Sequence, residues 1–295
     1  MANQKEIRTK IDSVKKTKKI TSAMKLVAAA KVRKVQKKVV AARPFSEKLS
    51  AIINSLREAV KQDIDLSKYP LLRNHGEVKK VLLLVISSDR GLCGGYNANI
   101  VKATKKRIAE VKAAGQEPVL FTVGRKATSA LEKLGENIAD SMVNLPSMPT
   151  ITEAEIIAEK VEELFNAKEV DKVEVVSTKF ISMVRADVKT HNFLPINLSE
   201  EFGETENKPN PYIIFDKDID SLINALLPMF VQNFIFQALL EATASELAAR
   251  MTAMSNATTN ADNFINGLVL TYNKARQASI TQELSEIVGG AAALG

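Results

Sequence analysis

The last third of the chain constrains the fold most, because it carries almost nothing that could end a helix. Residues 229–288 contain no proline and a single glycine, Gly267. At 1.5 Å per residue, one uninterrupted helix of that length would extend roughly 90 Å, whereas helices in globular proteins average ~10–14 residues. Residues 1–43 contain neither glycine nor proline. The sequence therefore predicts a long helix at each end of the chain.

Apolar and small side chains recur on both predicted helices at coiled-coil spacing. In the C-terminal helix, alternating steps of four and three residues connect Leu247, Met251, Met254, Thr258, Ala261, Ile265, Leu268, Tyr272, Ala275 and Ser279. In the N-terminal helix the spacing is helical but shifts phase, through Ile7, Ile11, Val14, Ile20, Met24, Val27, Ala28, Val32, Val35 and Val39. A period of 3.5 residues is typical of left-handed coiled coils.

We therefore expect the two terminal helices, which come from opposite ends of the chain, to pair as an antiparallel two-helix coiled coil. The first helix loses regularity around Pro44, although residues 45–60 could continue it. The C-terminal helix is expected to extend beyond its partner. Its unpaired part would then have to bury its apolar face in another protein.

The middle of the chain alternates strand and helix patterns. Residues 70–228 hold eight prolines and eight glycines, so helix breakers concentrate there. We expect an α/β domain with a largely parallel, Rossmann-like sheet. We expect an N-terminal coiled-coil helix in residues 1–69, the central α/β domain in residues 70–211 and a C-terminal coiled-coil helix in residues 212–295. Expected strands cover residues 81–86, 119–123, 138–143 and 173–177, with weaker ones at 188–194 and 212–215; expected helices cover 97–114, 125–134 and 151–165, the last with Thr152 as a possible N-cap.

Charge is distributed unevenly along the chain. The formal net charge is +7, yet residues 1–43 alone carry 14 Lys and Arg against 2 Asp and Glu. This asymmetry indicates an acidic partner, which could be nucleic acid, an anionic membrane or an acidic protein surface. The single cysteine excludes an internal disulfide. We expect no transmembrane helix, since polar residues interrupt the most apolar stretch, and no secretory signal or transit peptide.

A glycine-rich loop, residues 87–97, follows the first expected strand and precedes a helix. Phosphate-binding loops occupy this position, but the loop matches neither common phosphate-loop pattern. Its two readings are a nucleotide site at residues 91–95 and an exposed turn that contacts another protein. Cys93 would need a base to act as a nucleophile, and neither His75 nor His191 lies in a catalytic motif. We expect no catalytic residue, metal site or cofactor.

Several segments resemble the gamma subunit of F-type ATP synthase, of the bacterial type. The most specific is ITQELSEIVGGAAA at residues 280–293. The similarity extends to ARMTAM at 249–254, YNKARQAS at 272–279, ITSAMKLVAAAK at 20–31 and DRGLCGGYN at 89–97. Chloroplast and cyanobacterial members carry an additional central segment for which this chain has no room.

The resemblance implies a non-catalytic rotor shaft that couples proton flow to ATP synthesis or hydrolysis. Its partners would be the alpha and beta subunits of the catalytic ring, the epsilon subunit and the membrane c-ring. One copy would serve each complex, at the cytoplasmic face of the bacterial inner membrane, without nucleic acid or a small-molecule substrate. The implied subunit contacts are Met24, Cys93, Arg250, Gln277, Thr281 and Glu283, and the implied ring contacts are Tyr212, Ile214 and Phe215.

Other details follow from the same resemblance. The basic N-terminal helix would face an acidic lever segment of beta, and the apolar tip at residues 291–294 would turn in an apolar bearing. Two alternatives remain at this point. A basic coiled coil that binds nucleic acid would show salt-dependent affinity for DNA, and a nucleotide-using α/β enzyme would bind a ligand at residues 91–95.

Overall fold

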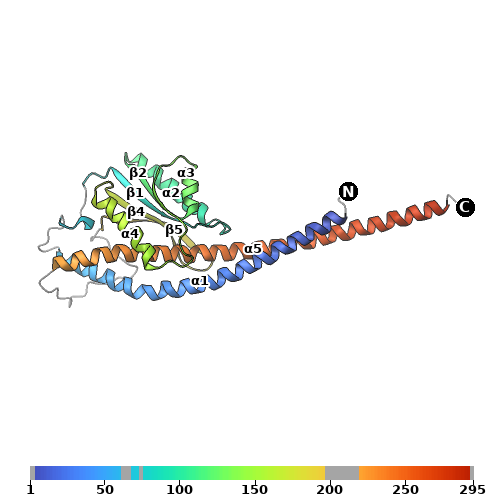
Figure 1. Ribbon diagram of the computed structural model, residues 1–295, viewed down its shortest axis with the longest axis horizontal. Coiled ribbons are helices and arrows are strands. Elements are labelled where there is room, and N and C mark those ends of the chain that lie inside the picture. The colour runs from blue at the N-terminus through green and yellow to red at the C-terminus, as the bar shows by residue number, and fades with distance from the viewer. Residues whose placement is uncertain (1–3, 61–67, 73–75, 197–218, 293–295) are drawn as a thin grey trace. The chain divides into compact units, whose positions relative to one another are not determined.

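The computed structural model describes residues 4–60, 68–72, 76–196 and 219–292. Along the chain, one long helix precedes a series of alternating strands and helices, and a second long helix follows it (Figure 1). The elements are α1 (Gln4–Val60), the 3-10 helix η2 (Pro70–Leu72), β1 (Lys80–Ile86), α2 (Tyr96–Ala113), β2 (Glu117–Val123), α3 (Arg125–Glu132), β3 (Ile138–Met142), α4 (Ile151–Asn166), β4 (Lys172–Phe180), β5 (Ala186–Leu194) and α5 (Ile219–Ala292).

The chain packs as two compact units, and both long helices contribute to each of them. The α/β unit, Ala30–Ala249, contains the sheet and the adjoining parts of α1 and α5. The coiled-coil unit combines Met1–Ala29 with Arg250–Gly295. Packing therefore divides the chain at other points than the distribution of Gly and Pro, because continuous helices cross from one unit into the other.

The sheet has the order β3-β2-β1-β4-β5. The first four of these strands are parallel, and β5 runs antiparallel to β4. This confirms the prediction of a largely parallel sheet. Six of the seven β1 residues are buried, since helices cover both faces of the central strand. Burial on both faces explains why its sequence is a continuous apolar run rather than an alternating one.

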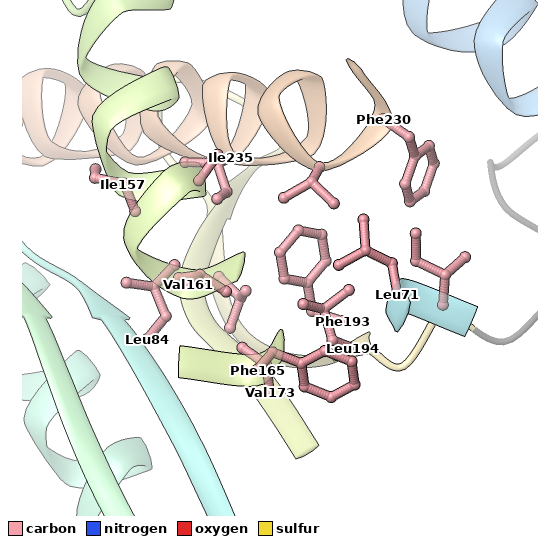
Figure 2. Packing of buried hydrophobic residues seen from close by; sticks show 14 of the residues in the cluster. Leu71, Leu84, Ile157, Val161, Phe165, Val173, Phe193, Leu194, Phe230 and Ile235 are labelled. Atoms are coloured by element: carbon pink, nitrogen blue, oxygen red, sulfur yellow. The ribbon is translucent and has the colours of Figure 1, made fainter. Parts of the chain in front are cut away.

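Alternate residues of β1 enter two different cores within the α/β unit. Val81, Leu83 and Val85 pack with residues of α2 and α3. Leu82 and Leu84 pack on the opposite face with α4 and with the first part of α5 (Figure 2). The members of that second core that Figure 2 labels are Leu71, Leu84, Ile157, Val161, Phe165, Val173, Phe193, Leu194, Phe230 and Ile235.

Both long helices continue through a proline. Pro44 lies inside α1, and Pro228 lies inside α5, which begins at Ile219, ten residues before the predicted helix. An internal proline removes a backbone hydrogen bond and costs ~3 kcal/mol. Packing offsets this cost, because Leu227 and Phe230 on either side of Pro228 are buried in the α/β unit. Proline alone was therefore a poor guide to where these helices begin and end.

Helix α5 also meets the length and composition of a membrane-crossing helix over Asp220–Ala291. Its most apolar stretch, however, supplies core residues to the α/β unit. Buried in that core are Ile223, Leu227, Phe230, Val231, Ile235 and Leu239. A core helix satisfies the same length and composition criterion.

The N-cap of α4 is Thr150 rather than Thr152. The Glu153 carboxylate accepts hydrogen bonds from both the backbone N–H (2.7 Å) and the hydroxyl (2.6 Å) of Thr150. Thr150 and Glu153 have the spacing of a capping box, which was the better sequence signal. Partial burial alone would raise the pKa of Glu153, but these hydrogen bonds lower it below its ordinary value.

The weak strand expected at residues 212–215 lies outside the described residues.

In the coiled-coil unit, the predicted seam of α5 is confirmed from Met251 to Ser279, since every seam residue there is buried or partly buried. The α1 seam needs a correction. Ile20 and Val27, which were predicted to lie in the seam, are exposed, and Thr21 is buried in place of Ile20, whereas Ala28 is buried as predicted. With Thr21 and Ala28 the seam keeps its 3.5-residue period without a phase shift. Hydrophobicity alone placed Ile20 in the seam, although the neighbouring threonine occupies the inner position.

Candidate functional site

Polar contacts interrupt the seam of the coiled-coil unit. Thr21 Oγ1 and Thr258 Oγ1 lie 2.8 Å apart, and one of the two hydroxyls donates to the other. Lys18 forms an ion pair with Asp262 one turn along each helix. Toward the N-terminus of α1 the seam becomes apolar again, with Ile265 of α5 buried in the cluster there. These contacts confirm that the two chain ends pair in antiparallel fashion.

Helix α5 extends past its partner in this unit. Gln4, in the first turn of α1, donates a hydrogen bond from Nε2 to the carbonyl oxygen of Ala275 at 3.4 Å. The contact candidates Gln277, Thr281 and Glu283 follow this point, and all three are exposed. The Thr281 hydroxyl donates to the carbonyl oxygen of Gln277 at 2.9 Å. Gln277 and Glu283 keep side-chain groups that a partner protein can reach.

The remaining contact candidates of this unit lie elsewhere. Arg250 and Met24 are both partly exposed. Met24 is one helical turn from Thr21, which faces Thr258, so it lies toward the Arg250 end of the pair. About 40 Å of helix separates Arg250 from Gln277. The candidate contact residues therefore fall into two separate groups along the coiled-coil unit.

Apolar side chains form an exposed stripe on the unpaired part of α5. Ile280, Leu284, Ile287 and Val288 share one helix face, and between 48% and 68% of each residue is exposed. An uncovered apolar face of this kind is typical of a protein contact surface. We call these four residues the C-terminal stripe. The sequence analysis placed the apolar contact only at residues 291–294, one turn further on.

Basic side chains dominate one groove of the coiled-coil unit. Lys15, Lys16 and Lys19 of α1 line it, and all three are exposed. Lys18 also lines it, but its charge is compensated in part by Asp262. Apolar positions complete the lining, with Ala23, Leu26 and Ile265 among them. The groove can therefore receive a segment that is both acidic and apolar.

In the α/β unit, the loop of residues 87–97 holds Cys93 in a buried position, with 2% of the residue exposed. Asn97 Nδ2 donates a hydrogen bond to the Cys93 Sγ at 3.1 Å. The Asn97 Oδ1 accepts from the backbone N–H of Ser88 at 3.2 Å. The thiol therefore supports the loop from inside, and a partner would touch other residues of the loop first.

The same loop supplies a carboxylate that occupies the N-terminus of α3. A phosphate in this part of an α/β sheet binds at a helix N-terminus. At the start of α3 a protein carboxylate already takes that place. Asp89 accepts hydrogen bonds from the backbone N–H of Arg125 and of Leu145, each at 3.0 Å. Among the described residues, no group of three or more His, Cys, Asp or Glu is arranged to hold a metal ion.

A buried carboxylate elsewhere in the α/β unit has a structural partner set. Glu174 of β4 accepts from Arg107 of α2, at 2.6 Å and 2.8 Å, and from Lys172 at 2.7 Å. Burial would raise the pKa of Glu174, but the hydrogen bonds from Arg107 and Lys172 lower it below its ordinary value. This cluster fastens α2 to the sheet.

The ring-contact candidates Tyr212, Ile214 and Phe215 lie outside the described residues. Besides the C-terminal stripe, the sequence analysis did not single out Leu92, which is 65% exposed in the loop beside Cys93. An apolar side chain among the glycines of a surface loop was the signal that could have found it.

Comparisons with known proteins agree on one family. A family model described as ATP synthase matches residues 3–294. The ATP synthase gamma chain of Cyanothece sp. is 43% identical over 318 aligned positions that span all of both chains, and that of Nostoc punctiforme is 44% identical over 317. Both alignments are longer than the 295 residues of this chain, so these relatives contain residues that it lacks.

Solved structures share the fold. A chain of the central stalk and c-ring structure of Tetrahymena thermophila mitochondrial ATP synthase matches with a TM-score of 0.61 and 26% identity, over 81% of this chain and 99% of the other. A chain of a Euglena gracilis mitochondrial ATP synthase structure matches with a TM-score of 0.67 and 21% identity, over 99% and 94%. With relatives this similar over its whole length, the chain belongs to the ATP synthase gamma chain family.

Proposed function

We propose that the coiled-coil unit is the part of the protein that enters the catalytic ring of alpha and beta subunits. The observation that carries this proposal is the unpaired end of α5, where the C-terminal stripe is exposed on a helix that has passed the start of α1. In a soluble protein, a stripe of four large apolar side chains favours burial in another protein.

As a gamma chain, the protein is the non-catalytic central rotor shaft of F-type ATP synthase. Its geometry suits the transmission of torque. Helices α1 and α5 are continuous over 57 and 74 residues, and they pair through a regular seam in the coiled-coil unit. A supercoiled pair resists bending and twisting more than a single helix, because each side chain of the seam packs between residues of the partner helix.

Contacts at the C-terminal end combine apolar burial with a few polar groups. Apolar burial has no preferred direction, so the C-terminal stripe can remain buried while the shaft turns. Gln277, Thr281 and Glu283 would add directional hydrogen bonds to loops of alpha and beta. Many strong, directional hydrogen bonds at every rotation angle would oppose turning of the shaft. With three polar side chains proposed to form them, the number of such bonds stays small.

The basic groove is proposed to face an acidic lever segment of the beta subunits. Lys15, Lys16 and Lys19 would supply long-range attraction, which sets encounter and orientation more than affinity. Met24 and Arg250, which lie at the same end of the coiled-coil unit, would both contact the catalytic ring. The shaft would therefore contact the catalytic ring in two places, at Met24 and Arg250 and at the unpaired end of α5.

The other partners are proposed from the family resemblance. Tyr212, Ile214 and Phe215 would contact the membrane c-ring, and the epsilon subunit would be a further partner. The complex would hold one copy of the chain at the cytoplasmic face of a bacterial inner membrane, where proton flow through the ring turns the shaft. The cyanobacterial gamma chains that the protein resembles are in keeping with a bacterial membrane.

Co-expression tests the proposal directly. The chain is expressed with the alpha and beta subunits of the same organism, and the purified complex is examined for a six-membered ring around one copy of it. A second preparation carries Arg250→Ala, Gln277→Ala and Glu283→Ala, and both chains are also expressed within the whole ATP synthase in membrane vesicles, where proton flow drives ATP synthesis. We expect that this triple variant assembles but that its coupled ATP synthesis falls about 10-fold, because fewer than a third of interface residues cost more than about 1 kcal/mol when truncated, and one such loss is about tenfold.

The matched control carries alanine at the exposed α2 residues Lys102, Lys105 and Lys106, which lie outside the proposed contacts. It should retain the coupling of the unaltered chain. Undiminished coupling in the Arg250, Gln277 and Glu283 variant would show that these residues are not the ring contacts. Failure of the unaltered chain to join a ring would refute the proposed placement of the coiled-coil unit.

A further inference from the structure

Polar side chains interrupt the apolar seam between α1 and α5 inside the α/β unit. On α1, alternating steps of three and four residues connect the buried and partly buried positions Val32, Val35, Val39, Ala42, Ser46, Leu49 and Ile53. On α5, the same spacing continues the seam toward the start of the helix through Leu247, Ala244, Leu240, Gln237, Asn233 and Phe230. Three polar residues therefore occupy inner positions of an otherwise apolar seam. We call Ser46, Asn233 and Gln237 the Ser46 cluster.

The Ser46 hydroxyl uses all of its hydrogen-bonding capacity in this cluster. Its Oγ accepts hydrogen bonds from Asn233 Nδ2 at 2.7 Å and from Gln237 Nε2, and it donates to the carbonyl oxygen of Ala42 at 3.3 Å. A serine hydroxyl has one donor and two acceptor sites. Asn233 is only 8% exposed, so its amide would be costly to leave without an acceptor. One oxygen atom thus joins two helices from opposite ends of the chain.

Apolar contacts on both sides of the Ser46 cluster do not by themselves define one alignment of the helices. Val39 shares a core with Leu240, and Leu49 shares another with Phe230. Because apolar burial has no preferred direction, sliding α1 by one helical turn, ~5 Å, would still bury apolar side chains against one another. The same movement would place the two amides opposite Ala42 or Leu49, whose side chains contain no hydrogen-bond acceptor.

We propose that the Ser46 cluster fixes the register of α1 against α5 in the α/β unit and prevents the two helices from sliding along each other. A buried polar residue has this effect in coiled coils, where it specifies register at a cost in stability. The inference goes beyond the proposed function, since it concerns contacts within the chain and requires no partner subunit. Register matters in a rotor shaft, because a helix that slides along its partner absorbs torque instead of transmitting it.

Loss of the Ser46 cluster should affect stability and register differently. Ser46→Ala removes the shared acceptor and leaves two amides unpaired, so the Tm of the α/β unit, measured on the full chain, should fall by about 3 °C. A triple variant, Ser46→Ala with Asn233→Leu and Gln237→Leu, replaces all three polar groups with apolar ones. Its Tm should equal or exceed that of the unaltered chain. Circular dichroism on heating measures both values.

Distances between two spin labels measure the register itself. The labels are attached through Lys37→Cys and Ala225→Cys, at exposed positions of α1 and α5, in a chain that also carries Cys93→Ser. This labelled chain should give one narrow distance distribution. The triple variant should add a second population displaced by one helical turn, ~5 Å. Ser46→Ala should also broaden the distribution, because its amides no longer favour one alignment.

Thr243→Val is the matched control. The Thr243 hydroxyl is partly buried on α5, but it donates to the carbonyl oxygen of Leu239 in its own helix at 2.8 Å. This variant should therefore keep the single narrow distance. One unchanged distance in both Ser46→Ala and the triple variant would overturn the proposal. If the triple variant does not fold, an unchanged distance in Ser46→Ala alone overturns it.

Discussion

Glu174 shows how a single buried charge is stabilised in the α/β unit. Only 1% of its side chain is exposed, and Arg107 and Lys172 neutralise it from two elements. Taking a carboxylate out of water is costly unless it is paired and hydrogen-bonded. The ion pairs of Glu174 therefore add little to the free energy of unfolding by themselves. Removing one partner, however, would leave an unpaired buried charge, which is strongly destabilising.

We predict that Glu174→Gln destabilises the chain by about 3 kcal/mol, since it leaves Arg107 and Lys172 without their shared carboxylate. Denaturant unfolding of the full chain measures the change. The control is Glu110→Gln, because Glu110 bonds the same Arg107 at 2.8 Å but has an exposed side chain. Exposed pairs contribute roughly 0–1 kcal/mol. Equal losses in the two variants would contradict the structural role of the buried pair.

The lowered pKa of Glu174 also gives a pH dependence. A carboxyl whose folded pKa lies below its unfolded value contributes its full stability above the unfolded pKa of about 4.3. This stability is lost as the pH falls below that value and through the lower folded pKa. The free energy of unfolding should therefore fall more steeply below pH 4.5 in the unaltered chain than in Glu174→Gln. Parallel curves for the two proteins would rule this out.

At the scale of the elements, polar residues in the coiled-coil seam have a measurable role. The hydroxyls of Thr21 and Thr258 contact each other at 2.8 Å, and each also lies within hydrogen-bond distance of a carbonyl oxygen in its own helix. Replacing one partner of a buried hydrogen bond is more costly than replacing both with apolar groups of similar shape. The pair should therefore behave non-additively.

We predict that Thr21→Val and Thr258→Val each destabilise the coiled-coil unit by about 1 kcal/mol, whereas the double variant is neutral or more stable. Loss of helical circular dichroism on heating the full chain measures the effect. Thr9→Val is the control, because Thr9 is exposed on the same helix. Additive losses in the double variant would mean that the two hydroxyls do not interact.

Sequence reasoning succeeded where one physical effect dominated. The apolar run at 81–86 could only be a strand buried on both faces, and the α5 seam from Met251 onward repeats without ambiguity. It failed where two effects compete. Pro44 and Pro228 break helices locally, yet packing over many residues outweighs them. In α1, Ile20 is more hydrophobic than Thr21, but the 3.5-residue geometry places Thr21 inside.

The candidate site was predicted less completely than the fold. The unpaired end of α5 was predicted from helix length, because a helix that continues past its partner leaves a face uncovered, and the contact residues named there came from the resemblance. The loop at Cys93 depends on a left-handed turn at Leu92 and on hydrogen bonds from Ser88 and Asn97. No periodic pattern encodes such contacts, so the sequence located the loop but not which residue it exposes.

For the whole molecule, the two units differ greatly in how much they bury. The α/β unit has two apolar cores on the faces of its sheet. Among the described residues of the coiled-coil unit, those classed as buried are Ile7, Ile11, Thr21, Ala28, Met254, Ala261 and Ile265. Buried apolar area sets most of the stability of a unit. The coiled-coil unit should therefore be the less stable one in the isolated chain.

We predict that the isolated chain loses structure in two steps on heating, with the coiled-coil unit melting first. Local stability follows buried contacts, and the unpaired end of α5 has very few. In hydrogen exchange, amides of residues 4–20 and 260–290 should exchange at least 100-fold faster than those of β1 and β4. Assembly with alpha and beta should slow the exchange of these two segments, because partners that bind only the folded state stabilise it. A single cooperative transition with uniform protection would contradict the prediction, and would mean that the shaft keeps its stiffness without its partners.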